Sequence, residues 1–219
     1  MSFKKNKYQI IRKAISKELA VFVANYFSLQ KQVYDTCLES RYFSPFETIL
    51  GVYELENEQV PHTYSCYSDI AMETLLLKCQ PKMEEICSLK LIPSYTYARI
   101  YKKGDKLKRH KDRFNCEISA TMNLAGDSWP IFLEPDHTKG GEKEGKGYVS
   151  ENTKGIKVDL EPGDMLVYSG CELEHWRNEF KGEECVQVFL HYNNVETKGA
   201  EEHMFDKRPH LGLPSWFKR

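Results

Sequence analysis

Two side chains that can bind a metal stand two positions apart in the segment His110-Lys-Asp112. On a β-strand, residues i and i+2 point to the same face and lie about 6.6 Å apart, so this imidazole and carboxylate can converge on one cation. His175 and His191 are the candidates for a third ligand, because both lie in the predicted β region. His175 follows the turn at 162–164 and a predicted buried strand, which places it near the open end of that region.

Two histidines and one carboxylate leave three coordination positions of an iron ion open, and this arrangement is typical of non-haem Fe(II) oxygenases. The short His-x-Asp pattern is weak by itself, because it also occurs by chance as a surface charge pair on a lysine-rich turn. Its interpretation therefore depends on the segments around it.

Apolar residues at helical spacing predict two helices before this segment. The first covers about residues 10–32 and the second about residues 69–87. Ser68 is the candidate N-cap of the second helix, and Pro81 is expected to break it or to start a new one. The region between the two helices has no clear period, and we expect loops with short strands there.

After Pro93 the sequence changes to short β-branched and aromatic runs that are separated by turn signals. The predicted strands cover 95–101, 118–124, 129–133, 155–160, 165–168 and 186–192. The glycine-rich and charged segment 136–153 is interpreted as a surface excursion. Short strands at this spacing indicate a sandwich or a barrel.

Composition excludes several classes of protein. The 219 residues carry 31 Lys+Arg and 32 Asp+Glu, and this balance argues against nucleic-acid binding by bulk electrostatics. Seven cysteines without a CxxC pair are expected to be free thiols in a reducing compartment. Neither a signal peptide nor an apolar run of membrane-spanning length is found, so we expect a cytoplasmic protein with no membrane partner.

The flanks of the His-x-Asp segment resemble a known signature. The run RIYKKG at 99–104 followed by HKD at 110–112 is similar to the R-Y-x-x-G … H-x-D signature of 2-oxoglutarate/Fe(II)-dependent oxygenases of the prolyl hydroxylase type. The run PGDMLVY at 162–168 followed by His175 resembles the strand and distal histidine of the same family. The match covers residues from about 8 to 193.

The resemblance implies a double-stranded β-helix, also called a jelly-roll or cupin-like core, in one oxygenase domain over residues 1–219. Residues 1–92 would be mostly helical support, 93–194 the core, and 195–219 a C-terminal tail.

The resemblance also implies that His110, Asp112 and His175 are the catalytic metal ligands and bind Fe(II). In that family 2-oxoglutarate chelates the iron, O2 takes the remaining position, and a C–H bond is hydroxylated with release of succinate and CO2. Ascorbate is expected to support turnover. By similarity the leading substrate is a peptidyl prolyl residue, so a peptide or protein is favoured over a small molecule. The alternative is a cupin-like module that binds a metal or ligand without oxidative turnover.

Relatives usually anchor the distal carboxylate of 2-oxoglutarate with an Arg or Lys about ten residues after the distal histidine. The corresponding stretch here, EECVQ at 183–187, has no cation. Arg177 and Arg99 are the candidate substitutes, because alternation along a strand places them on the faces of His175 and Tyr101 respectively.

Two further pocket residues follow from the resemblance. Tyr101 stands at the family's tyrosine position and is expected to bind the cosubstrate, and Asn123 stands where a polar pocket residue is common.

Two residues have alternative interpretations. For Arg177 the alternative is a salt bridge to Glu174 or Glu179. His191 is expected to line the pocket or to satisfy a hydrogen bond in the core.

Overall fold

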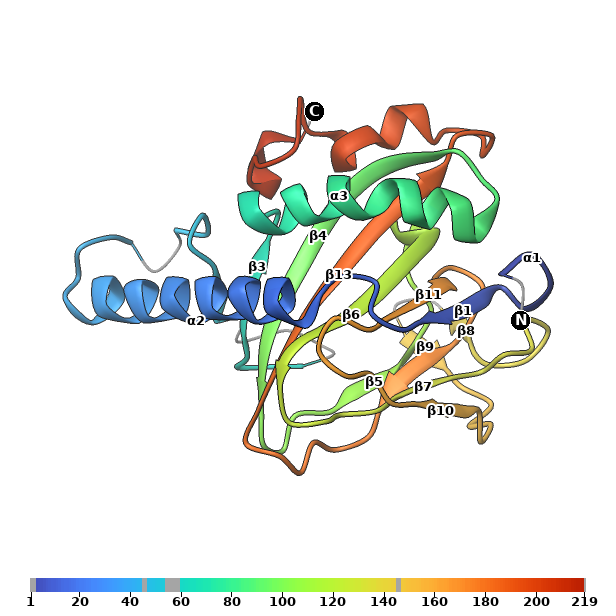
Figure 1. Cartoon of the computed structure of the whole chain (residues 1–219), viewed down its shortest axis with the longest axis horizontal. Coiled ribbons are helices and arrows are strands. Elements are labelled where there is room, and N and C mark those ends of the chain that lie inside the picture. The colour runs from blue at the N-terminus through green and yellow to red at the C-terminus, as the bar shows by residue number, and fades with distance from the viewer. Residues whose placement is uncertain (1–2, 45–46, 54–59, 145–146, 219) are drawn as a thin grey trace.

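The computed structural model describes residues 3–44, 47–53, 60–144 and 147–218. Two antiparallel sheets face each other, and helices α2 (Lys17–Glu39) and α3 (Ile70–Cys87) cover the outer face of the larger sheet (Figure 1). The predicted architecture, mainly β with supporting helices, is confirmed.

Helix α2 begins at Lys17, so the predicted start near residue 10 is wrong. Ser16 caps the helix, because its hydroxyl oxygen accepts a hydrogen bond from the N–H of Leu19 at 3.1 Å. Ile10 and Ile11 belong instead to β1 (Tyr8–Ile11), the edge strand of the larger sheet, which pairs with residues 165–168. The prediction failed because the apolar residues before Ser16 happen to continue the helical spacing of those after it.

Helix α3 is capped by Asp69 rather than by Ser68, since an Asp69 carboxylate oxygen accepts a hydrogen bond from the N–H of Met72 at 3.0 Å. Pro81 was expected to interrupt this helix, yet the helix continues through it. A proline removes the hydrogen bond to the carbonyl four residues earlier, here that of Leu77. Both residues lie on the exposed face, where water can bind that carbonyl.

The larger sheet has the strand order β1-β11-β6-β13-β4-β3-β2, with antiparallel pairing throughout. The further bounds are β11 Met165–Ser169, β6 Ile118–Gly126, β13 Glu184–Asn194, β4 Leu91–Lys102, β3 Tyr64–Tyr67 and β2 Val52–Tyr53. Strands β2 and β3 lie where loops with short strands were expected, whereas β1 lies where the first helix was predicted to begin. Together they extend both edges of the sheet.

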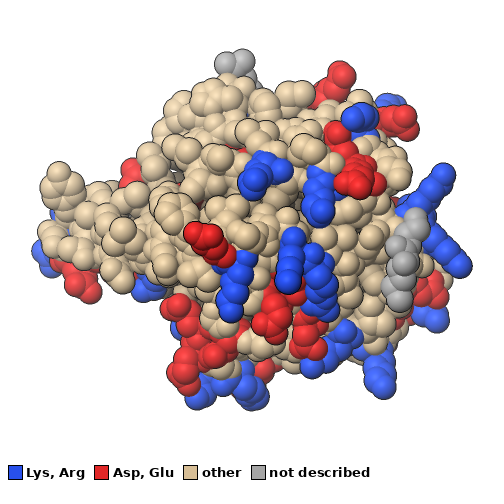
Figure 2. Space-filling view, in the orientation of Figure 1, with Lys and Arg blue, Asp and Glu red and all other residues tan. Residues whose placement is uncertain are grey.

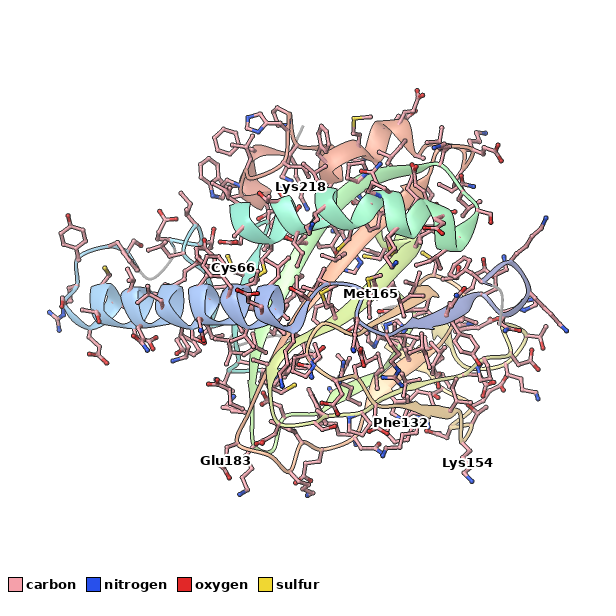
Figure 3. The ribbon with its side chains drawn as sticks, in the orientation of Figure 1. Cys66, Phe132, Lys154, Met165, Glu183 and Lys218 are labelled. Carbon is pink, nitrogen blue, oxygen red and sulfur yellow. The ribbon has the colours of Figure 1, made fainter. Side chains whose placement is uncertain are left out.

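The smaller sheet has the order β10-β7-β12-β5. Its bounds are β10 Ile156–Val158, β7 Ile131–Leu133, β12 His175–Arg177 and β5 Leu107–His110. The remaining elements are the pair β8 (Glu142–Glu144) and β9 (Gly147–Val149), the short helix α1 (Phe3–Asn6), and the 3-10 helices η1 (Phe114–Cys116), η2 (Glu201–Lys207) and η3 (Ser215–Phe217). Met165 and Phe132 mark the larger and the smaller sheet in Figure 3.

The two faces of the larger sheet differ in chemistry. On β13, Val186, Val188 and Leu190 belong to the apolar core that includes the helices. The alternate residues Gln187 and His191 are also buried, but they lie on the opposite face, towards the smaller sheet. Polar side chains are therefore concentrated between the two sheets.

The C-terminal tail packs on the body beside β4 and α3. Arg208 pairs with Glu73 of α3 at 2.7 Å, and the Asp206 carboxylate accepts hydrogen bonds from Arg113 at 2.9 and 2.8 Å. Within the described ranges, no helix combines the length and the apolar character needed to cross a bilayer. On the face shown in Figure 2, acidic and basic side chains are interspersed.

Candidate metal centre

The structure brings the three predicted ligands together. His110 ends β5, His175 begins β12, and the antiparallel pairing of these strands places the two histidines opposite each other. Asp112 follows β5 and is held by its own N–H, which donates to the carbonyl of Gly170 at 2.8 Å. Its Oδ1 lies 3.6 Å from Nε2 of His110 and 3.5 Å from Nε2 of His175. One donor atom from each of the three residues therefore lies within 4.8 Å of the other two.

Hydrogen bonds to backbone carbonyls determine which ring nitrogen of His110 and of His175 carries the proton. Nδ1 of His110 lies 2.8 Å from the carbonyl oxygen of Lys108, and Nδ1 of His175 lies 2.9 Å from that of Leu173. A carbonyl only accepts, so each Nδ1 carries the proton and each Nε2 keeps its lone pair. Such contacts orient metal-binding imidazoles in known metal sites.

The charges of the cluster suit a cation. Burial lowers the pKa of His110 to about 4, so this imidazole is neutral at pH 7. Burial opposes ionisation of Asp112, but the neighbouring imidazoles, His175 first, hold its pKa well below the usual range. Burial also acts against a charge on His175, yet attraction to Asp112 raises its pKa overall. A metal must displace a proton from His175 at low pH.

Arg177 lies two residues beyond His175 on β12 and is fully buried. Its guanidinium donates to the carbonyl of Trp129, to Oγ1 of Thr121 at 3.3 Å and to Oε1 of Gln187 at 3.3 Å. All three acceptors are uncharged. The Nε of Arg177 has no partner among the residues that the structure describes.

The alternative of a salt bridge for Arg177 is wrong. Glu174 pairs with Arg109 at 2.6 Å, and Glu179 pairs with Lys181. Burial lowers the pKa of Arg177, but a guanidinium stays charged in proteins. A buried charge without a counter-ion is costly to the fold. A buried cation that contacts only uncharged acceptors therefore lies two residues from His175.

The other predicted pocket residues gather around the same point. Arg99 and Asn123 lie opposite Gln187 on the two strands that flank β13. Arg99 donates to the hydroxyl of Tyr97 at 3.2 Å. Asn123 donates to a backbone carbonyl, and its Oδ1 has no partner within the described part of the chain. Tyr101 is buried edge-on against Trp129, with ring centroids 4.7 Å apart.

Some residues of the pocket were not predicted. Gln187 lies in the stretch where a family cation was sought, and Thr121 lies beside it, with its hydroxyl 3.3 Å from Gln187 Oε1. The alternation along β13 was a usable signal, because it places Gln187 on the same face as His191. Tyr168 also packs edge-on against the ring of His175, with ring centroids 4.7 Å apart.

The burial of Glu174 could not be inferred from the sequence. A glutamate is usually exposed to solvent, yet Glu174 is fully buried. Its carboxylate accepts hydrogen bonds from Arg109, Tyr148 and Ser150, at 2.6, 2.9 and 2.9 Å. The surface excursion folds back over β12 and supplies two of these donors.

Solved structures of known proteins share this fold. The chain is similar to the crystal structure of a prolyl-4-hydroxylase from Pseudomonas putida, with a TM-score of 0.55 and 13% identity over 88% of this chain and 95% of that chain. It is similar to SnoN, an α-ketoglutarate-dependent epimerase from nogalamycin biosynthesis, with a TM-score of 0.61 and 11% identity over 88% of this chain and 80% of that chain.

A third similar structure is HygX from Streptomyces hygroscopicus with nickel and 2-oxoglutarate bound, with a TM-score of 0.55 and 12% identity over 93% of this chain and 92% of that chain. No protein-family model and no curated protein matches the chain. At these identities the likeness shows the fold. The chain has the double-stranded β-helix architecture of the 2-oxoglutarate/Fe(II)-dependent oxygenases, as the resemblance of its motifs to that family implied.

Proposed function

We propose that this protein is an Fe(II)- and 2-oxoglutarate-dependent oxygenase that hydroxylates a C–H bond. One observation carries the proposal: His175, which completes the set of three donors, shares a short strand with Arg177, a buried cation without a carboxylate partner in the described structure. This arrangement supports the proposal of a metal site with an anion site beside it.

The donor set fits ferrous iron. His110, Asp112 and His175 would hold the ion, and the remaining positions would serve the cosubstrate and O2. When bound, iron would activate O2 as the oxidant for hydroxylation, and 2-oxoglutarate would serve as the co-reductant that is converted to succinate and CO2. The chain contributes orientation, because both imidazoles are fixed through Nδ1. It also buries His175, whereas His110 and Asp112 are partly exposed.

Arg177 is the proposed anchor of the distal carboxylate of 2-oxoglutarate. Residues two apart on a strand are separated by roughly 6.6 Å, a step that a five-carbon dicarboxylate can span from the metal. A guanidinium presents forked donors that match a carboxylate. Thr121 and Gln187 hold the guanidinium in place, and we propose that Tyr101, Asn123 and Arg99 line the rest of the cosubstrate pocket.

The alternative, a cupin-like module without turnover, was favoured by the missing cation at 183–187. Arg177 supplies a buried cation from β12, in the smaller sheet, so the missing cation at 183–187 no longer favours the binding module. The module remains an outcome of the experiment below.

For the substrate we propose a peptidyl prolyl residue, on the likeness to the prolyl-4-hydroxylase from Pseudomonas putida. The similar structures also include an epimerase, so the panel of substrates should include small molecules.

The test is succinate formation from 2-oxoglutarate with Fe(II), ascorbate and O2, with and without proline-containing peptides. We expect turnover by the wild type and by Lys111→Ala, a matched control because Lys111 stands between the two ligands. We expect none by His110→Ala or Asp112→Ala. Tight Fe(II) binding without any consumption of 2-oxoglutarate would instead support the binding module.

A further inference from the structure

We propose that a buried histidine outside the ligand set, His191, positions the Asp112 carboxylate through the hydroxyl of Ser119. The inference rests on the proposed function in one respect, that His110, Asp112 and His175 bind a metal. In this role Ser119 and His191 are positioning residues.

The two oxygens of Asp112 have different surroundings. Oδ1 faces the Nε2 atoms of His110 and His175, whereas Oδ2 accepts a hydrogen bond from the Ser119 hydroxyl at 3.1 Å. Oδ1 is therefore the oxygen available to a metal. An Asp112 that uses a single oxygen leaves one more coordination position for other ligands.

The Ser119 hydroxyl has one proton and three neighbours. Its Oγ lies 3.1 Å from Oδ2 of Asp112, 2.9 Å from the carbonyl oxygen of Cys116 and 2.9 Å from Nδ1 of His191. The ionised carboxylate is the strongest acceptor of the three, so the proton points to Asp112. His191 must then donate its Nδ1 proton to the Ser119 oxygen. The direction of the chain is from His191 to Ser119 to Asp112.

The backbone fixes this chain. Ser119 on β6 and His191 on β13 lie directly opposite each other in the strand pairing. The His191 ring also packs against Tyr95, with ring centroids 4.6 Å apart, and the Tyr95 hydroxyl lies 3.1 Å from Sγ of Cys116. The imidazole has little freedom to turn away from Ser119.

Gly170 lies against the same carboxylate oxygen, Oδ2, that accepts from Ser119. A Cβ added at this glycine would lie 2.3 Å from Oδ2 of Asp112 and 2.8 Å from Oγ of Ser119. Any side chain at position 170 would therefore clash with Asp112 and Ser119, so this close approach of the backbone requires glycine. Together, Gly170 and Ser119 keep the carboxylate from rotating.

The same region offers another possibility. Donor atoms of Asp112, Cys116 and His191 also lie close enough together to hold a cation. If they did, His191 would be a ligand and Asp112 would bridge two ions. The stoichiometry of metal binding separates this arrangement from the positioning role.

The experiment is titration of the full-length protein with Co(II) under anaerobic conditions, followed by calorimetry and by the visible d–d absorption of the bound ion. The variants are Ser119→Ala, His191→Leu and His191→Asn, in which the amide nitrogen can replace the Nδ1 donor. His110→Ala reports on the metal site itself. Ser94→Ala is the matched control, because Ser94 is a buried serine whose hydroxyl has no partner among the described residues.

We expect one Co(II) per chain in the wild type. Ser119→Ala and His191→Leu should each lower the affinity about 10- to 100-fold, the usual loss when the support of a ligand is removed, and should change the d–d spectrum. His191→Asn should restore most of the affinity and the wild-type spectrum, and Ser94→Ala should match the wild type. Circular dichroism of the metal-free variants checks that each is folded; if Ser119→Ala is not, the two His191 variants decide.

Wild-type affinity and spectrum in both Ser119→Ala and His191→Leu would overturn the inference, and so would equal losses in His191→Leu and His191→Asn or a stoichiometry of two. Failure of the wild type to bind Co(II), or binding that His110→Ala leaves intact, would instead overturn the metal site. The two failures are therefore distinct.

Discussion

Buried charges in the C-terminal tail have counter-ions within the described structure, whereas the buried Arg177 beside the metal ligands contacts only neutral groups. In the tail, Arg208 is paired with Glu73, and both side chains are almost fully buried. Asp206 is held by Arg113, Asn115 and Lys218. Figure 3 labels Lys218 in this region.

In the pocket, by contrast, the buried Arg177 meets only neutral acceptors. A charge neutralised within the chain supports the fold. A buried charge without a counter-ion destabilises the fold, but it can form an ion pair with a ligand of opposite charge. The comparison predicts that changes in the tail affect stability and that changes in the pocket affect binding.

The largest effect is expected for Glu73→Gln. This change leaves the buried Arg208 without its counter-ion, and loss of one partner of a buried pair costs about 3–5 kcal/mol. Urea denaturation monitored by circular dichroism should show this loss in the free energy of unfolding. A loss below about 1 kcal/mol, as for an exposed pair, would contradict the structural role of the tail.

Arg177→Met should act in the opposite way. We expect the affinity for 2-oxoglutarate to fall roughly 100-fold, since a charge-assisted hydrogen bond contributes about 1.5–3 kcal/mol. The free energy of unfolding of the metal-free protein should change little, because the lost hydrogen bonds are offset by removal of an unpaired buried charge. Anaerobic calorimetry with 2-oxoglutarate measures the first effect and urea denaturation the second. Unchanged affinity would show that another group anchors the cosubstrate.

Asp206 gives a pH-dependent effect. Burial alone would raise its pKa, but hydrogen bonds from Arg113 and then from Lys218 and Tyr67 lower it to about 2. The unfolded value is about 3.9, so the stabilisation is complete above that pH and is lost as pH falls through about 2. Asp206→Asn should flatten the dependence of the free energy of unfolding on pH between about 4 and 2. Equal slopes for variant and wild type would refute this assignment.

The smallest effect concerns the helix-covered face. The Thr96 hydroxyl is buried without a hydrogen-bond partner in the described structure. Thr96→Val keeps the shape and removes a desolvated polar group, so we expect the free energy of unfolding to rise by about 1 kcal/mol or less. The affinity for 2-oxoglutarate should not change. A destabilised variant would mean that the hydroxyl is satisfied by water.

Much of the site followed from local spacing. The i, i+2 spacing predicted that His110 and Asp112 converge, and they do, although β5 ends at His110 and Asp112 lies just beyond the strand. The same rule put Arg177 on the face of His175. The predicted strands were found because period-two alternation and turn residues are local signals.

The predictions failed where the same local sequence is compatible with different tertiary environments. Pro81 breaks a helix in the interior of a protein, but on an exposed face water can bind the carbonyl that it frees. Glu174 is charged, yet distant donors such as Arg109 and Tyr148 make its burial possible.

The sequence by itself determined which side chains can bind a metal, which strand faces they share, and that the N-terminal third supplies helices. Only the tertiary structure decided which charges are neutralised within the chain, because counter-ions such as Glu73 and Arg208 come from positions 135 residues apart. It also decided that His191 reaches Asp112 through Ser119. Strand pairing joins these residues, and no spacing along the chain encodes it.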